Sequence, residues 1–175
     1  MSRSAREPDD LLLGEWACLG LLYAKPSHGF AVAARLKPDQ DVGRIWSLTR
    51  PLTYRALEQL ESHKYIAETG QEAGLAGGNR TLMRATNAGR AIFRNWLASP
   101  VVHLRDFRSE LLLKIVLADE CDIDVSKMLV QQRKTVVVLS NNIEAALQAA
   151  KGNDVVLQWR REIAEATLRF IDTLK

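Results

Sequence analysis

The sequence predicts a mainly α-helical protein with one small β-hairpin near its middle. Aromatic residues make up only 6% of the 175 residues, and the chain has only 10 Gly and 5 Pro, which disfavours a turn-rich β-sandwich. Apolar residues instead recur at spacings of three and four over most of the length, as on the buried faces of helices. Strand-like alternation is confined to residues 65–85.

The first predicted helix is capped by Asp9 or Asp10 and ends before Pro26, and the second is capped by Ser27 and ends before Pro38. Both ends follow from proline, which disfavours helical geometry in the residue before it. The apolar positions of the short second helix are Phe30, Val32, Ala33 and Leu36.

A third helix is predicted after a polar connection over 39–43. Ser47 or Thr49 can cap it, and Pro51 fits only its first turn. Its buried face is predicted from apolar spacings of three and four at Leu52, Ala56, Leu57 and Leu60.

Alternating residues predict a β-hairpin after the third helix. Strands over 65–69 and 80–85 flank a flexible turn at 74–79, and Thr86 then caps a fourth helix that ends near Pro100. Three helices, a hairpin and a further helix describe an N-terminal winged helix-turn-helix over residues 1–100, with the hairpin as its wing.

Residues 101–175 predict a second, C-terminal helical domain. A strongly apolar helix over 106–118 is followed by acidic residues over 119–124, a long helix over 125–150, a break over 151–154 and a last helix. Apolar positions of the long helix recur every seven residues at Leu129, Val136, Ile143 and Ala150, with Gln132, Leu139 and Ala146 between them. The last helix repeats in the same way at Val156, Ile163 and Phe170, with Trp159 and Ala166 interleaved.

Seven-residue spacing indicates a coiled-coil seam, and the two helices are expected to form an antiparallel hairpin. Such a hairpin exposes more apolar surface than it buries alone. We therefore expect an antiparallel helical dimerisation domain and a homodimer.

Charge is unevenly distributed along the chain, whose formal net charge is +3. Residues 25–94 hold eleven basic and six acidic side chains, whereas residues 101–175 hold eleven of each. The first stretch therefore suits a polyanionic partner, although an ordinary solvated surface explains an excess of this size equally well.

Cysteine usage and hydropathy indicate a cytoplasmic protein. Cys18 and Cys121 cannot staple a fold of this size, and neither has a metal-ligand spacing around it, which predicts a reducing compartment. No apolar stretch is long enough to span a bilayer, and Glu7, Asp9 and Asp10 stand where a secretory signal carries positive charge. We expect neither export nor a membrane partner.

Several motifs together resemble the PadR family of bacterial transcription regulators. They run in the family's order and at its spacing over about the first 118 residues: Pro26-Ser27-His28-Gly29-Phe30, Ile45-Trp46-Ser47-Leu48-Thr49-Arg50, Tyr54-Arg55-Ala56-Leu57-Glu58-Gln59-Leu60-Glu61, Arg80 with Thr86-Asn87-Ala88-Gly89-Arg90, Trp96-Leu97 with Pro100-Val101, and Arg105-Asp106-Phe107-Arg108. Beyond them, only the length and helical character of the tail resemble the virulence-activator-type C-terminal domain of many members. The resemblance implies a dimeric, DNA-binding transcription regulator of the repressor type.

The chain departs from the family's pattern around the third helix and in the wing. Members often have a Gly-Gln/Thr-Leu-Tyr run where this chain has residues 51–54, and a glycine where it has Lys64. Met83 and Ala85 replace the tyrosine and leucine common in the second wing strand. The base preference of relatives therefore does not transfer to this sequence.

The residue types also suit double-stranded DNA, since a recognition helix presents its N-terminal side chains to base edges. Hydroxyl groups and free helix N–H groups suit phosphate, as do basic residues on the wing. The predicted DNA-binding residues are Ser47, Thr49, Arg50, Thr53, Tyr54 and Arg55 around the third helix, with Arg80 and Arg84 on the wing. An ordinary surface helix with an arginine or two is the alternative interpretation.

No enzyme activity, cofactor or metal site is expected. Residues 74–78 lack the spacing and lysine of a P-loop, and residues 122–133 lack the glycine and glutamate of a calcium loop. His28, His63 and His103 lie far apart with no paired ligand motif.

Two functions remain open: a DNA-binding regulator, and a winged-helix protein-interaction module without sequence-specific DNA binding. Finding Arg50, Tyr54 and Arg80 on one exposed face favours the regulator, whereas an apolar surface on the third helix favours the module. The family resemblance also implies that some relatives release DNA on binding small aromatic compounds. Candidate effector-binding residues are Trp16, Trp96, His103 and Phe107, for which ordinary packing is the alternative interpretation.

Overall fold

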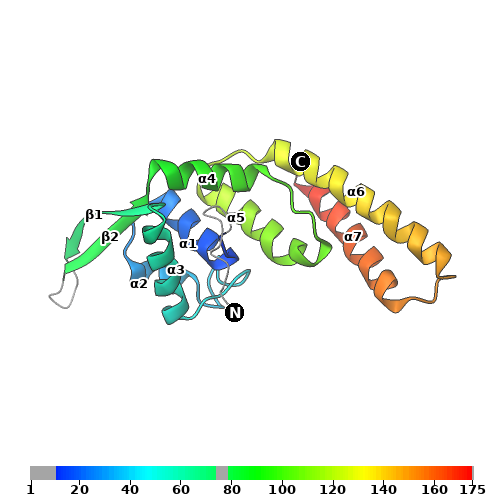
Figure 1. Cartoon of the computed structure of the whole chain (residues 1–175), viewed down its shortest axis with the longest axis horizontal. Coiled ribbons are helices and arrows are strands. Elements are labelled where there is room, and N and C mark those ends of the chain that lie inside the picture. The colour runs from blue at the N-terminus through cyan, green and yellow to red at the C-terminus, as the bar shows by residue number, and fades with distance from the viewer. Residues whose placement is uncertain (1–10, 74–78, 175) are drawn as a thin grey trace, which may run out of the picture. The chain divides into compact units, whose positions relative to one another are not determined.

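A computed structural model describes residues 11–73 and 79–174 of the chain (Figure 1). Helices dominate these residues, which include one two-stranded antiparallel sheet. The element order is three helices, the strand pair and then further helices, so the predicted winged helix-turn-helix is confirmed. In the part of the chain described, no helix has the length and apolarity needed to cross a membrane.

The chain divides into two compact units. The first contains the described residues up to Trp96 together with Leu113–Ile123. The second contains Leu97–Leu112 and the described residues from Asp124 onward. The segment Leu113–Ile123 therefore belongs to the first unit, although it lies beyond residue 100 in the sequence.

Helix α1 spans Leu13–Ala24 and carries most of the core of the first unit. Its N-cap residue is Leu12, whose backbone N–H donates to the carboxylate of Glu15 at 2.6 Å. The carboxylate that accepts a hydrogen bond from the backbone at the start of α1 is therefore that of Glu15, in the first turn of the helix itself. The predicted caps Asp9 and Asp10 lie outside the described residues.

Helix α2 spans Gly29–Arg35 and is capped by His28, not by Ser27 as the sequence predicts. The Nδ1 atom of His28 accepts the backbone N–H of Ala31 at 3.1 Å. Ser27 is unavailable as a cap because its backbone pairs with Met83 of the wing through two hydrogen bonds of 3.0 Å.

Helix α3 spans Arg50–Ser62, with Thr49 at the N-cap position and Pro51 in the first turn, as predicted. The Thr49 side chain makes no capping hydrogen bond. One face of α3 is buried against the core of the unit through Thr53, Ala56, Leu57 and Leu60.

The wing consists of β1, Ile66–Ala73, and β2, Asn79–Ala85. The strands are antiparallel, with Ile66 opposite Ala85, and the register shifts between Glu68 and Gly70. Residues 74–78 of the predicted turn lie outside the described residues. Lys64, just before the wing, has a φ of 60°, in the left-handed region that favours glycine.

Helix α4 spans Asn87–Ala98 and is capped by Thr86 as predicted, since the Gly89 N–H donates to Thr86 Oγ1 at 3.1 Å. A Cβ at Gly89 would lie 2.0 Å from the backbone oxygen of Tyr65, so α4 approaches this backbone too closely for a side chain. The ring of Trp96 stacks on Trp16 of α1 at 4.8 Å between centroids.

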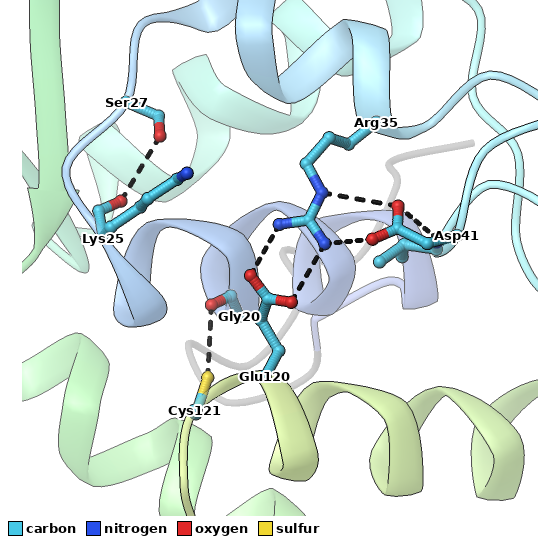
Figure 2. A network of polar contacts seen from close by, with 8 residues as sticks. Gly20, Lys25, Ser27, Arg35, Asp41, Glu120 and Cys121 are labelled. Atoms are coloured by element: carbon cyan, nitrogen blue, oxygen red, sulfur yellow. Dashed lines mark hydrogen bonds and ion pairs between the residues drawn. The ribbon is translucent and has the colours of Figure 1, made fainter.

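Helix α5, Leu112–Glu120, connects to α2 through a polar network at its C-terminal end (Figure 2). The Arg35 guanidinium donates to both carboxylate oxygens of Glu120, at 2.7 and 3.1 Å, and also to Asp41. These contacts lower the pKa of both carboxyl groups. Nearby, the Cys121 Sγ lies 3.5 Å from the Gly20 carbonyl, and burial raises the pKa of this thiol to about 11.

The second unit begins with a buried side-chain clamp. The Gln132 side chain is fully buried, and its Oε1 accepts the Val101 N–H at 2.6 Å while its Nε2 donates to the Val101 carbonyl at 2.8 Å. A 3₁₀ turn at Leu104–Asp106 and a π-helical turn at Phe107–Leu111 follow, so the predicted helix over 106–118 starts irregularly.

Helices α6, Ser126–Ala149, and α7, Val155–Thr173, form the predicted antiparallel hairpin. An ion pair of 2.9 Å between Arg133, early in α6, and Asp172, late in α7, fixes their relative direction. The buried residues of the hairpin are Met128, Gln132, Val136, Ile143 and Leu147 of α6, and Ala164 and Ile171 of α7.

Most of the heptad positions predicted for α7 are exposed in the hairpin. Val156, Trp159 and Phe170 are exposed, and Ile163 is half-buried. The neighbouring column that contains Ala164 and Ile171 packs in the hairpin instead.

Candidate nucleic-acid interface

The N-terminal end of α3 is a rigid platform, because the residues behind it are anchored in the core. Thr53 is fully buried, and its hydroxyl donates to the Thr49 carbonyl at 3.1 Å. Pro51 presets the helical backbone of the first turn. Arg50, the first residue of the helix, is therefore presented at the surface from a fixed backbone.

A hollow of about 610 Å³ lies between α3 and the wing. Arg50 and Tyr54 reach it from α3, and Arg80 reaches it from β2. These three predicted residues therefore share one surface of the first unit. The hollow is also lined by His28, Phe30, Glu58, Glu61, Glu68 and Thr81.

Aromatic rings lie beneath both arginines of this hollow. The Arg50 guanidinium carbon is 5.4 Å from the ring centroid of Phe30 and 5.6 Å from that of Tyr54. The Arg80 guanidinium carbon is 5.6 Å from the same Phe30 ring. These are cation–π distances, so one exposed aromatic residue contacts cations from two separate elements.

The arginines of this surface differ from others in the chain in their pairing. Among the residues that the structure describes, neither Arg50 nor Arg80 has a carboxylate partner. Arg35 and Arg133, by contrast, are each held in an ion pair. The two guanidinium groups therefore have no ion pair to break on meeting an anion, while Glu58, Glu61 and Glu68 line other parts of the same hollow.

A second hollow of about 330 Å³ lies on the α2 side of the α3 N-terminus. It brings together the exposed hydroxyl residues Ser47 and Thr49 with Lys37 and Arg50. Hydroxyl groups beside the free N–H groups of a helix start, together with two cations, are suited to phosphate oxygens. Leu52, which is 49% exposed, adds an apolar side to this hollow.

Three of the eight predicted DNA-binding residues lie elsewhere. Arg55 and Arg84 are exposed but line neither of the two hollows. Thr53 is wrong as a base-contacting residue, because it is fully buried and its hydroxyl bonds within α3.

The residues that sequence reasoning missed include Phe30, Lys37 and the glutamates on the outer face of α3. In the sequence, Phe30 is only one of the apolar positions of the second helix, and the structure leaves it 50% exposed. The core side of α2 is formed by Val32, Ala33 and Leu36.

The four candidate effector residues are divided between the two units. Trp16 and Trp96 belong to the first unit and stack face to face with an interplanar angle of 5°. The Lys114 ammonium lies 5.0 Å from the Trp96 ring centroid. His103, which is exposed, and Phe107, which is buried, belong to the second unit. Their joint participation in one effector site stays a prediction.

Comparisons with known proteins give structural similarity only. No protein-family model and no curated protein matches the sequence. The chain is similar to the crystal structure of Bacillus subtilis PadR in complex with operator DNA, with 15% identity, a TM-score of 0.47, and coverage of 91% of this chain and 96% of that chain. It is also similar to the PadR-like transcriptional regulator BC1756 from Bacillus cereus, with 19% identity, a TM-score of 0.41, and coverage of 98% and 97%.

Proposed function

We propose that this chain is a DNA-binding transcription regulator whose α3 N-terminus and wing contact double-stranded operator DNA. The observation that carries the proposal is the pair Arg50 and Arg80, which share one hollow with the exposed Tyr54 and have no carboxylate partner among the described residues. A guanidinium group matches the two acceptors of guanine in the major groove. Helix α3 is the reading element, and the wing fixes its register on the phosphates.

The charge order along α3 supports a function for its N-terminal end. Arg50 lies in the first turn and Glu61 in the last turn, the reverse of what the helix dipole favours. Each misplaced charge costs about 0.3–1 kcal/mol at an exposed helix end. A basic N-terminus facing DNA gives this unfavourable order a physical reason.

The test is fluorescence anisotropy of the purified full chain with DNA from upstream of its own gene and with a scrambled duplex. An Arg50→Ala, Tyr54→Ala double variant should lose discrimination between the two, since a good bidentate base contact contributes about 1–3 kcal/mol. Arg80→Ala should weaken both duplexes alike and reduce the salt dependence. Arg105→Ala is the matched control, because Arg105 is 81% exposed in the second unit and its removal changes the net charge equally.

Equal operator affinity for the wild type and the double variant would refute the assignment of α3. The alternative, a protein-interaction module, is favoured by one observation, the exposed Leu52 on α3. Under that alternative, neither duplex binds even at low salt.

The regulator acts as a homodimer through the second unit. The exposed column Val156, Trp159 and Phe170 on α7 recurs with heptad spacing, and Trp159 is 65% exposed. A second copy that covers this column removes a large apolar area from water. A twofold dimer also provides two reading heads for two half-sites, as helix-turn-helix proteins require.

Analytical ultracentrifugation tests the dimer. The wild type should sediment at twice the chain mass of 19.6 kDa, and Trp159→Ala should shift the population toward the monomer. Arg160→Ala, at the adjacent exposed position, should leave the dimer intact. A soluble, unchanged dimer after deletion of residues 125–175 would contradict this role for the hairpin.

The proposed regulator is a repressor that a small aromatic compound releases from DNA. The effector must have a higher affinity for the protein conformation that does not bind DNA than for the one that does. A shift from nearly full to nearly empty operator takes a difference of about 5.5 kcal/mol between these two binding free energies. In the first unit, the proposed aromatic contacts of the effector are Trp16 and Trp96, with Lys114 over the latter. Titration with phenolic acids and flat aromatic cations, read by tryptophan fluorescence and operator release with Trp96→Ala as control, tests this. A reporter gene behind the operator should be expressed more strongly when the chain is absent.

A further inference from the structure

The exposed ring of Phe30 is unusual for its surroundings. A large apolar side chain that is 50% exposed contributes little to folding, yet Phe30 lies beside charged residues of both signs, among them Arg50, Arg80 and Glu68. It lines the hollow against the wing, the hollow at the α3 N-terminus and a third hollow of about 380 Å³ beside α1. A single side chain therefore lies at the meeting point of all three.

Two guanidinium groups lie over this ring. Arg50 from α3 and Arg80 from β2 lie 5.4 and 5.6 Å from its centroid. Neither has a carboxylate partner in the described part of the chain, so no ion pair fixes either group. An arginine without such a partner has several rotatable bonds and loses entropy when it binds.

His28 does not replace Phe30 in holding Arg80. The His28 Nε2 atom lies 3.3 Å from Arg80 Nη1, but its Nδ1 atom already accepts the Ala31 N–H. A neutral imidazole that accepts at Nδ1 carries its proton at Nε2, so Nε2 and the guanidinium are both donors and form no hydrogen bond. A carboxylate oxygen of Glu72 lies 3.9 Å from Nε2. The Phe30 ring is therefore a favourable contact for Arg80 that His28 does not replace.

We infer that Phe30 is a positioning residue for DNA reading, whose exposed ring holds Arg50 and Arg80 together so that base reading by α3 and backbone contact by the wing become energetically coupled. This inference rests on the proposed function. Phe30 itself has no group that hydrogen-bonds to a base or to a phosphate, so its role at the start of α2 is to position the two arginines. This role also explains why the ring remains exposed when the DNA is absent.

The first experiment needs no DNA. In NMR spectra of the full chain, the side-chain Hε and Hδ signals of Arg50 and Arg80 should be shifted by the ring current of Phe30. Phe30→Leu should return the Arg80 signals toward random-coil positions and the Arg50 signals only part of the way, because the Tyr54 ring also lies 5.6 Å from the Arg50 guanidinium. Phe30→Tyr should preserve the shifts. Trp46→Leu is the control, because it removes an exposed ring of the same unit over which no arginine lies in the described residues. Unchanged arginine signals in Phe30→Leu would overturn the inference.

The second experiment is a double-mutant cycle on DNA. The probes are a 30-bp duplex carrying the sequence that the wild type selects from a random pool, and a scrambled duplex of the same composition. Phe30→Leu should lower affinity for the selected duplex by about tenfold, from two cation–π contacts at exposed positions. When residue 30 is Phe or Tyr, the losses of binding free energy caused by Arg50→Ala and Arg80→Ala should not add up in the double variant. When residue 30 is Leu, the two losses should add up.

The outcomes separate this inference from the function on which it rests. If the wild type selects no sequence and binds neither duplex, the proposed function fails and the inference fails with it. If the wild type selects a sequence but Phe30→Leu binds it equally well, only the inference is wrong. Equal losses in Phe30→Leu and Phe30→Tyr, with additive arginine effects in both, would indicate shape complementarity and would also overturn it. Since Phe30 is half exposed, the thermal midpoint of each variant should match that of the wild type. Such a match excludes misfolding as the cause of a lost affinity.

Discussion

Replacement of Gln132 by Met should destabilise the second unit strongly, although the two side chains have similar length and helix propensity. Gln132 is fully buried, and Val101 is only 3% exposed. The amide satisfies both the N–H and the C=O of Val101, at 2.6 and 2.8 Å. Met leaves both backbone groups buried without a partner, and each such group costs about 1–3 kcal/mol. We expect a loss of about 3 kcal/mol in the free energy of unfolding.

The assay is urea unfolding followed by circular dichroism at one fixed protein concentration, since dimerisation makes stability depend on concentration. The midpoint should fall while the urea dependence of the free energy stays constant. Gln131→Met is the matched control, because Gln131 is the exposed neighbour on the same helix. If the two variants are equally stable to within about 0.5 kcal/mol, the surface effect expected of an exposed site, the clamp does not stabilise the unit.

Two further predictions concern the first unit. Arg35→Gln should destabilise the chain by about 1 kcal/mol at neutral pH, a value limited by solvent screening. Because Arg35 lowers the pKa of Asp41 and Glu120, its contribution is complete above their ordinary values of 3.8 and 4.5 and is lost as the pH falls through their lowered values. The difference between wild type and variant in acid titrations of stability should therefore vanish at low pH, and a constant difference would contradict the network. Gly89→Ala should lower the thermal midpoint sharply, since its Cβ would lie 2.0 Å from a backbone oxygen, while Gly70→Ala, with open space around it, should not.

Local signals in the sequence were sufficient for most of the fold. The long helix predicted over 125–150 is α6, Ser126–Ala149, and Thr86 caps α4 as expected. The cap of α2 was missed because Ser27 has the preferred chemistry but its backbone is engaged in a bridge to β2. Such a contact joins residues far apart in the sequence, and no local pattern contains it.

The α7 helix shows the limit of periodicity. Leu157, Ala164 and Ile171 form one column with seven-residue spacing, and Val156, Ile163 and Phe170 form the column beside it. Both columns are apolar, so spacing alone does not decide which one packs against α6. The structure packs the first column in the hairpin and leaves most of the second exposed.

The composition of the candidate DNA surface follows from helical phase. Thr53 belongs to the same three- and four-residue spacing as Ala56, Leu57 and Leu60, so the sequence contained the signal for its burial. The same phase leaves Arg50 and Tyr54, one turn apart, at the edge of the hollow. Helix α2 spans only seven residues, less than two full turns, and its apolar residues alone do not distinguish a buried Phe30 from an exposed one. The residue that joins the two arginines therefore becomes visible only when α2, α3 and the wing are placed together.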